Sequence, residues 1–361
     1  DLRRSRGLGD VYKRQRMNKQ FIAVIISFLL VSVILSGCLS DDVNSEDSLE
    51  DNQNELPPYQ EDGIYTCIDH DNVSRCWQTH IPDNLLINTP VPLIVDLHGF
   101  GSDSTEHRGI SDFNTIADEY NAIVVYPDGV TTQNSWDTEA NQGWNAGWCC
   151  ADPAMDDVDD VGFIEKMVEI SILKHNIDTN RIYLSGWSNG CAMAQRMAMD
   201  SSHIFAAVGC MSFYLVSDEH ADYSPIPIME VHGFLDQIVL YESSILSVPF
   251  NQGSWADLEA IETGAIENMY EWGGYNGCSG DLNTFELNAL YSIQGFDNCA
   301  NGTEVRLMTI YAAQHNPYAK NLDSGLISNV FQGTQGLVQS SFIVWDFISQ
   351  YSKNSSCDDC Y

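Results

Sequence analysis

The chain has 361 residues and is strongly acidic, with 51 Asp and Glu against 16 Lys and Arg and a formal net charge of −35. Proteins that bind nucleic acid carry basic patches, so we expect no nucleic-acid partner for this chain. The length of the part that is expected to fold lies within the range of one α/β domain.

The N-terminal region predicts export. Residues 1–16 precede the first methionine, Met17, and carry six of the sixteen basic residues, so we interpret them as an extension that is not native. Residues 17–37 resemble a lipoprotein signal peptide, since Lys19 is followed by an apolar run that ends in Leu-Ser-Gly before Cys38. We therefore expect lipidation at Cys38, membrane contact through that lipid, and an extracytoplasmic protein, lipid-anchored at the cell surface or secreted. The apolar run is also about long enough to span a bilayer, so an uncleaved anchor is the alternative.

Residues 38–62 are acidic and nearly free of apolar side chains, which predicts a disordered tether. Residues 63–352 are expected to fold as one domain, and residues 353–361 form a tail. Ten of the eleven cysteines remain once Cys38 is lipidated, and an even number in an exported protein favours disulfides over metal ligands. Their spacing matches no zinc cluster, so we expect no metal.

The expected domain alternates strands and helices, which predicts a mostly parallel sheet with helices on both faces. Residues 64–68 and 73–80 predict an N-terminal antiparallel hairpin, bridged by Cys67 and Cys76. Further strands are expected at 93–97, 122–126, 181–185, 205–210, 226–231 and 305–311, and helices at 161–175, 191–199, 255–272 and 338–351.

One turn in this alternation carries chemistry. Gly-Trp-Ser-Asn-Gly at 186–190 follows one expected strand and precedes a run of helix formers. A serine between glycines at a strand-to-helix turn is the nucleophile elbow of the α/β-hydrolase fold, and the helix N-terminus offers partial positive charge to an oxyanion. We therefore predict that Ser188 is a nucleophile. An ordinary glycine-rich turn is the alternative.

A serine nucleophile needs a base and an acid that orients the base, and in this fold they follow in the order Ser, Asp or Glu, His. Asp236 comes a loop's length after the strand 226–231 and is the expected acid. His315 follows the strand 305–311 and is the only histidine after Asp236, so it is the expected base. The earlier His232 is expected to lie outside the chemistry, although it could help to hold the acid loop.

The tetrahedral oxyanion needs two backbone N–H donors. We expect one from Asn189, directly after the nucleophile. The other is expected from Phe100 in the His-Gly-Phe-Gly segment at 98–101, where glycines allow close approach of the backbone. His98 is expected to brace that loop rather than to react.

These motifs resemble the poly(3-hydroxybutyrate) depolymerase-like and feruloyl esterase group, which are secreted α/β-hydrolases of the first carbohydrate-esterase family. The resemblance covers residues 64–350 and rests on the segments 98–101, 143–150, 159–163, 186–190 and 232–236 and on His315. It implies hydrolysis of esters in 3-hydroxyalkanoate polymers, or of aryl and acyl esters on plant polysaccharide. The group often has Trp-Pro after its Gly-His, whereas this chain has Gln-His-Asn-Pro-Tyr at 314–318.

Aromatic side chains on the loops around the expected site predict an acyl-binding wall, with structural packing as the alternative for each. The predicted substrate-binding residues are Trp144, Trp148 and Trp187, together with Phe100. The aspartate-rich run at 152–160 suggests calcium, but it lacks the spacing and the turning glycine of a known loop. Helix capping and solvated charge are therefore favoured for that run.

The remaining cysteines predict a covalent frame. Cys278 and Cys299 flank an insertion before the strand that delivers His315, so we expect them to be joined. We also expect pairing that ties the Trp144 loop to the elbow helix and its neighbours, without a definite connectivity, among Cys149, Cys150, Cys191 and Cys210.

The sequence thus predicts a serine carboxylic-ester hydrolase that needs no cofactor and acts on a polymeric or oligomeric ester. Poly(3-hydroxybutyrate) depolymerase-like activity is the first expectation, and feruloyl or acetylxylan esterase activity is the alternative. A catalytically inactive surface binding protein of the same fold and a peptidase are the further alternatives.

Overall fold

The computed structural model describes residues 59–62, 64–86, 88–132, 141–243, 263–322 and 332–353. The chain divides into two units, residues 1–54 and 55–361, and every described residue belongs to the second. Several expectations therefore lie outside the described residues: the extension 1–16, the signal 17–37, lipidation at Cys38, most of the tether, the first part of the helix 255–272, and all but the first residue of the tail.

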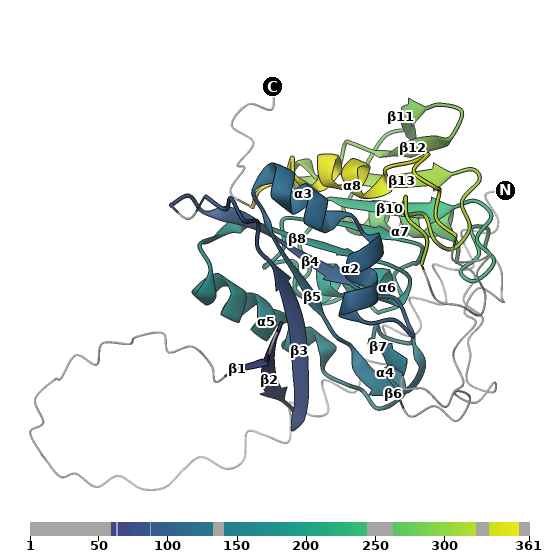
Figure 1. Ribbon diagram of the computed structural model, residues 1–361. Coiled ribbons are helices and arrows are strands. Elements are labelled where there is room, and N and C mark those ends of the chain that lie inside the picture. The colour runs from purple at the N-terminus through teal and green to yellow at the C-terminus, as the bar shows by residue number, and fades with distance from the viewer. Residues whose placement is uncertain are drawn as a thin grey trace, which may run out of the picture. The chain divides into compact units, whose positions relative to one another are not determined.

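Eleven strands form one mixed sheet in the order β1-β2-β3-β5-β4-β8-β9-β10-β13-β12-β11 (Figure 1). The six in the middle run parallel: β5 (Ile123–Pro127), β4 (Val91–Leu97), β8 (Ile177–Gly186), β9 (Ala207–Met211), β10 (Ile228–Gly233) and β13 (Val305–Ile310). Antiparallel strands flank them: β1 (Gln60–Asp62), β2 (Tyr65–His70) and β3 (Val73–His80) on one side, β12 (Tyr291–Phe296) and β11 (Asn283–Leu287) on the other. A separate pair joins β6 (Val130–Thr132) to β7 (Asn141–Gly143).

Helices cover both faces of the sheet, as the alternation predicts. Alternate residues of β4 enter two different cores, Leu93 and Val95 on one face and Ile94 on the other, because successive strand side chains point to opposite sides. The first core packs against α5 (Asp160–Lys174), α6 (Asn189–Asp200) and α7 (Ala265–Tyr275). The second packs against α2 (Ser104–Ile110), α3 (Phe113–Tyr120) and α8 (Ser340–Ile348). The short α4 (Ala151–Met155) precedes α5, and a 3-10 turn (Ala300–Gly302) precedes β13.

The expected N-terminal hairpin is present as β2 and β3. Cys67 and Cys76 are register partners across it and are joined by a disulfide. The two turn residues, Asp71 and Asn72, have φ angles of 52° and 63°. Left-handed backbone at both central positions is the geometry of a type I′ turn, which matches the twist of the flanking strands.

Several elements differ from the sequence prediction. The strands β1, β6 and β7 and the helices α2, α3 and α4 were not predicted. The hairpin β11–β12 was not predicted, because the segment between Cys278 and Cys299 was interpreted as a Gly- and Asn-rich insertion. In the structure β12 pairs antiparallel with β13 and so widens the sheet beside the strand that delivers His315. The start of the helix expected at 255–272 lies outside the described residues. Where the two can be compared, α7 begins at Ala265, so residues 263–264 are not helical, contrary to the prediction, and it continues three residues further, to Tyr275.

Four disulfides join described residues. The structure pairs Cys278 with Cys299, as expected, and Cys67 with Cys76. The expectation that disulfides tie the Trp144 loop to the elbow helix is wrong: Cys149 pairs with its neighbour Cys150 inside the loop, and Cys191 of α6 pairs with Cys210 of β9. Disulfides on this scale are typical of compartments outside the reducing cytoplasm.

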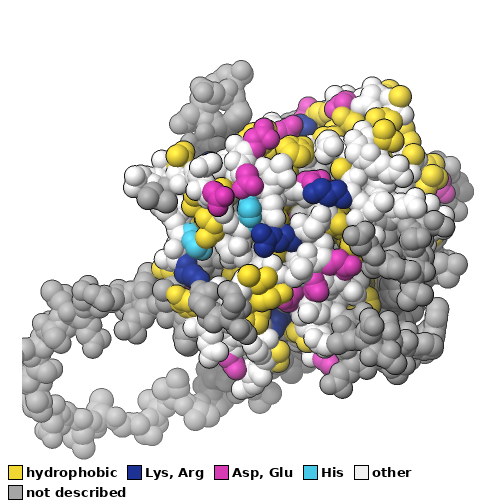
Figure 2. Space-filling view, in the orientation of Figure 1, with side chains coloured by type: hydrophobic (Ala, Val, Ile, Leu, Met, Phe, Trp, Pro, Cys, Tyr) yellow, Lys and Arg dark blue, Asp and Glu magenta, His cyan; other side chains and the backbone are white. Residues whose placement is uncertain are grey.

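The described surface of the folded unit carries few basic side chains on the face shown in Figure 2. On the described part of the face shown in Figure 2, basic side chains lie singly and form no continuous patch. Among the described residues, no helix combines the length and the apolar composition needed to cross a bilayer.

Candidate active site

The turn between β8 and α6 has the geometry of an elbow. Ser188 stands between the two elements with φ 55° and ψ −125°, and its backbone N–H donates to the carbonyl of Met211 at 2.8 Å. A non-glycine residue at positive φ costs free energy, so the surrounding structure must hold it there. The flanking glycines are required by close approach, since a Cβ on Gly186 would overlap the backbone of Gly190 and a Cβ on Gly190 would overlap the backbone of Leu97.

Ser188, His315 and Asp236 form one continuous hydrogen-bonded relay. The distance from Ser188 Oγ to His315 Nε2 is 2.9 Å, and the distance from His315 Nδ1 to Asp236 Oδ2 is 2.8 Å. The three residues follow the carboxyl ends of β8, β13 and β10, which are neighbours or near neighbours in the sheet. A base that faces a serine hydroxyl and is oriented by a carboxylate is the arrangement that activates serine for attack.

Asp236 is held in place from both of its oxygens. Oδ1 accepts the backbone N–H groups of Ile238 at 2.8 Å and Val239 at 3.0 Å, and Oδ2 faces His315. Burial alone would raise the pKa of this carboxyl, but His315 and the neighbouring His232 hold the pKa well below its usual range. The acid of the relay is therefore ionised throughout the neutral range.

Trp187 positions the base rather than a substrate. Its indole Nε1–H donates to the backbone carbonyl of His315 at 2.8 Å, and the two rings lie 5.4 Å apart. The side chain is only 2% exposed, so the expectation that it forms part of a substrate wall is wrong for this structure. The reason is its direction, since it points into the core covered by α8 and not out of the turn.

The expected oxyanion donors lie on the two segments that meet at Ser188. Asn189 is the first residue of α6, where backbone N–H groups have no partner within the helix. Phe100 belongs to the loop after β4, and the glycine before it lies against the nucleophile, since a Cβ on Gly99 would be 3.4 Å from Ser188 Cβ. This arrangement is compatible with a hole formed by the N–H groups of Asn189 and Phe100, which stays a prediction.

His98 braces the loop after β4, as expected. Its Nε2 accepts the backbone N–H of Gly129 at 2.9 Å, so the ring proton is on Nδ1, which donates to the carbonyl of Gly99 at 2.8 Å. Burial lowers the pKa of His98 to about 4. The neutral ring therefore fixes the loop that carries Phe100.

Trp144 lies in the protein interior. It is fully buried, and its indole N–H donates to the carbonyl of His98 at 2.9 Å, so the expectation that it contacts substrate is wrong for this structure. Its backbone forms a reciprocal pair with the Asn189 side chain, with the N–H donating to Oδ1 at 2.7 Å and Nδ2 donating to the carbonyl at 3.1 Å. Hydrogen bonds, and not disulfides, tie this loop to the elbow. Trp148 is partly buried against the core and remains a candidate for substrate contact.

The aspartate run before α5 acts mainly in structure. The Asp159 side chain caps α5 by accepting the N–H of Gly162 at 2.9 Å, as the capping interpretation predicts. Asp160 is buried, pairs with Arg75 at 2.6 Å, and accepts the N–H of Asn145 at 2.7 Å. This buried pair fixes the loop that also holds Trp144.

Glu230 is a further residue of the site that was not predicted from the sequence. Its side chain is 3% exposed in β10 and lies 2.5 Å from Nδ1 of His232, one of the two histidines that face Asp236. A signal was present in the sequence, because an acidic residue interrupts an otherwise apolar strand two positions before a histidine. Residues two apart on a strand point to the same face.

A mostly parallel sheet covered by helices on both faces, with a serine elbow after a central strand and an acid and a histidine after later strands, defines an α/β-hydrolase. The family model described as esterase PHB depolymerase matches residues 70–254. The chain belongs to this family.

Relatives carry esterase names. A feruloyl esterase B from Piromyces equi is 27% identical over 241 residues, which cover 65% of this chain and 41% of the relative. A bifunctional acetylxylan esterase/xylanase from Neocallimastix patriciarum is 28% identical over 163 residues, covering 45% of this chain and 22% of the relative. This chain therefore matches less than half of the length of either protein. Among solved structures, an acetyl xylan esterase from Aspergillus awamori aligns with a TM-score of 0.46 and 17% identity, covering 67% of this chain and 89% of that one.

Proposed function

We propose that this protein is a serine carboxylic-ester hydrolase that acts through Ser188, His315 and Asp236. The observation that carries the proposal is the relay itself, with 2.9 Å between the serine hydroxyl and the base and 2.8 Å between the base and the acid. These are hydrogen-bond distances, so proton transfer needs no rearrangement of the three side chains.

The proposed reaction is a two-step acyl transfer. His315 Nε2 takes the hydroxyl proton as Ser188 Oγ attacks the ester carbonyl, while Asp236 holds the imidazolium that forms. The backbone N–H groups of Asn189 and Phe100 stabilise the oxyanion. His315 returns the proton to the departing alcohol, and a water activated by His315 then releases the acid from the serine. Every step uses groups of the chain, so the proposal names no metal or organic cofactor.

The proposed substrate is a polymeric or oligomeric ester. Family membership supports a polyester of the poly(3-hydroxybutyrate) type, while the names of the relatives support feruloyl or acetyl esters on polysaccharide as the second candidate. We further propose that the protein works outside the cytoplasm, anchored through lipid at Cys38. The disulfides support the compartment, and the lipobox-like ending before Cys38 supports the anchor.

Replacement of the nucleophile tests the proposal. Ser188→Ala should lower kcat/KM for p-nitrophenyl butyrate by about a thousandfold or more, with the melting temperature almost unchanged, and Asp236→Asn and His315→Ala should have large effects in the same direction. Ser185→Ala is the matched control, because within the described part of the chain its buried hydroxyl has no hydrogen-bond partner. Retention of a tenth of the activity in Ser188→Ala would show that another residue is the nucleophile.

A second assay separates the substrate candidates. The purified protein would be incubated with poly(3-hydroxybutyrate) film, methyl ferulate and acetylated xylan, with Ser188→Ala as the blank. If one substrate is turned over about tenfold faster than the other two, it identifies the substrate class of the enzyme. Tight binding without turnover by the parent protein would favour the inactive binding protein instead.

A further inference from the structure

Asp236 shares one oxygen between two histidines. Its Oδ2 lies 2.8 Å from Nδ1 of His315 and 3.4 Å from Nε2 of His232. The reaction proposed above uses the first contact and leaves the second without a role. His232 is the last residue but one of β10 and is fully buried, so its presence beside the acid needs a physical account.

Both ring nitrogens of His232 face acceptors. Nε2 lies 2.8 Å from the backbone carbonyl of Val239, which can only accept, so this nitrogen carries a hydrogen. Nδ1 lies 2.5 Å from Glu230 Oε1, a contact that places a proton between the ring and the carboxylate. If this proton belongs to the ring, both nitrogens donate and the ring is an imidazolium.

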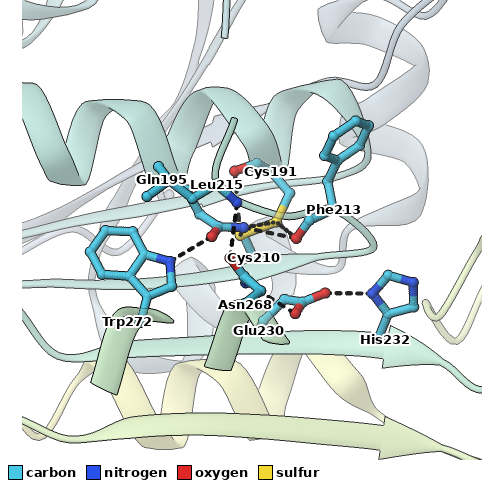
Figure 3. The surroundings of a disulfide bond; sticks show 9 residues. All are labelled: Cys191, Gln195, Cys210, Phe213, Leu215, Glu230, His232, Asn268 and Trp272. Carbon is cyan, nitrogen blue, oxygen red and sulfur yellow. Dashed lines mark hydrogen bonds and ion pairs between the residues drawn. A yellow bond between two sulfur atoms is a disulfide. The ribbon is translucent and has the colours of Figure 1, made fainter. Parts of the chain in front are cut away.

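Glu230 is oriented by α7. Its second oxygen, Oε2, accepts Nδ2 of Asn268 at 3.3 Å, and Asn268 in turn accepts the backbone N–H of Leu215 at 2.9 Å (Figure 3). An ionised carboxylate in the core is costly unless it is paired and hydrogen-bonded, and Glu230 has both kinds of partner. Figure 3 shows the carboxylate between the asparagine and the imidazole.

The groups that surround His232 are neutral or negatively charged, which favours a positive charge on its ring. The ring stacks on Tyr214 at 5.6 Å and meets Tyr241 edge-on at 5.8 Å, and burial raises the pKa of both phenols, so they stay neutral. Glu267 of α7 adds negative potential on both tyrosines. Burial alone would lower the pKa of His232, but the carboxylates of Glu230 and Asp236 raise it to about 10.

We propose that Glu230 and His232 form a positioning pair that extends the Ser188–His315–Asp236 relay, with His232 held as an imidazolium against the shared oxygen of Asp236. The inference rests on the proposed esterase function for its kinetic consequence. Because the pair has no net charge, it stabilises the Asp236 carboxylate without making the site positive. Its positive end lies next to Asp236 and its negative end on the far side, so it opposes protonation of His315.

The first experiment reads the proton directly. Nitrogen-15 NMR of the histidine rings at about pH 8 should show His232 with both nitrogens protonated, and His232→Gln assigns the signal by its loss. In Glu230→Gln, which keeps the shape but removes the charge, one nitrogen should lose its proton. A parent protein with one bare His232 nitrogen at this pH would overturn the proposal, whatever the variant does.

The second experiment reads the kinetic consequence. In Glu230→Gln the acidic limb of the kcat/KM profile should move to higher pH by about half a unit, as expected for the loss of a nearby dipole at an effective dielectric constant of about 20. A purely structural role would lower the melting temperature and leave the limb in place, and that result would overturn the positioning role.

Glu304→Gln is the matched control, because Glu304 pairs with Arg306 at the start of β13, at the opposite end of that strand from His315. It should affect stability but not the acidic limb. The NMR measurement does not depend on activity, so it is repeated in Ser188→Ala, which is expected to be inactive. If the parent protein is inactive but His232 is doubly protonated, the proposed esterase function is wrong and the proposed charge state of His232 is still supported.

Discussion

Trp187 donates its indole N–H to the backbone carbonyl of His315, so the residue before the nucleophile holds the residue that faces the nucleophile. The hydrogen bond joins residues 128 positions apart in the sequence and fixes the base relative to the elbow from within the core. Sequence position alone had suggested contact with substrate for this side chain, and its geometry assigns it to the support of the base.

Removal of this hydrogen bond should reduce turnover more than binding. Trp187→Phe leaves a buried carbonyl without its donor, and the loss of such a hydrogen bond costs about 1–2 kcal/mol. If this cost falls on the activation free energy, kcat should fall about tenfold while KM changes little. Steady-state kinetics on p-nitrophenyl butyrate would measure both constants. Trp272→Phe is the matched control, since it removes an equally buried indole N–H bond, to Gln195 at 2.7 Å, away from the relay. Equal loss of kcat in both variants would contradict a positioning role for Trp187.

The disulfide between Cys278 and Cys299 should contribute strongly to stability. It closes a separation of 21 residues, whereas Cys67–Cys76 closes 9. In the chain-entropy model, closing a loop of this size stabilises the folded state by roughly 3 kcal/mol, and the longer loop contributes somewhat more. Replacing both cysteines of each pair by serine and measuring chemical denaturation should give the larger loss for the 278–299 pair. Free thiols at these two positions in the untreated protein, found by peptide mapping without reduction, would refute the bond.

Acid should destabilise the protein through His98. Burial lowers its folded-state pKa from 6.5 to about 4. Between these two pH values the unfolded chain binds a proton at His98 and the folded chain does not. The stabilisation is therefore complete above pH 6.5 and is lost as pH falls through about 4, by about 3 kcal/mol over that window. In His98→Gln the free energy of unfolding, measured by chemical denaturation, should change less with pH across this range. Exposed His203 supplies the control variant, and the same flattening in His203→Gln would exclude His98 as the source.

Salt should stabilise the protein. From Cys38 onward the sequence has 49 acidic and nine basic residues, and we expect the surface of the folded domain to be acidic and self-repelling. The screening length falls to about 3 Å near 1 M salt, which removes most of that repulsion. Melting temperature and esterase activity should both rise from dilute buffer to roughly seawater ionic strength. A flat or falling melting curve over that range would contradict the expectation.

The parts of the fold that could be predicted are those with a local signal. Buried strands such as β4 and the elbow at 186–190 follow from apolar runs and from glycines that no other residue could replace. The pairing of Ser188 with Asp236 and His315 follows from their order along an α/β sheet, because parallel strands bring their carboxyl ends to one edge.

The parts that could not be predicted depend on where side chains point. Trp144 and Trp187 stand in loops at the correct edge, but both indoles turn inward to backbone carbonyls. The contact of Glu230 with His232 could not be predicted, because the apolar residues around Glu230 indicate only that the strand is buried. Cys149 pairs with Cys150, and no loop-length argument reveals a bond between adjacent residues.

The edge strand β11 bears on how the protein behaves at high concentration. Within the described residues it pairs only with β12, and the register between them shifts between Thr284 and Glu286. Glu286 is exposed and accepts the hydroxyl of Tyr291 at 2.6 Å, so the strand carries a carboxylate on its surface. An interrupted, charged edge is a poor template for a strand of another molecule. Although Leu287 is 71% exposed, sheets of neighbouring molecules should not join through β11, and concentrated solutions should stay free of fibres that grow from this edge.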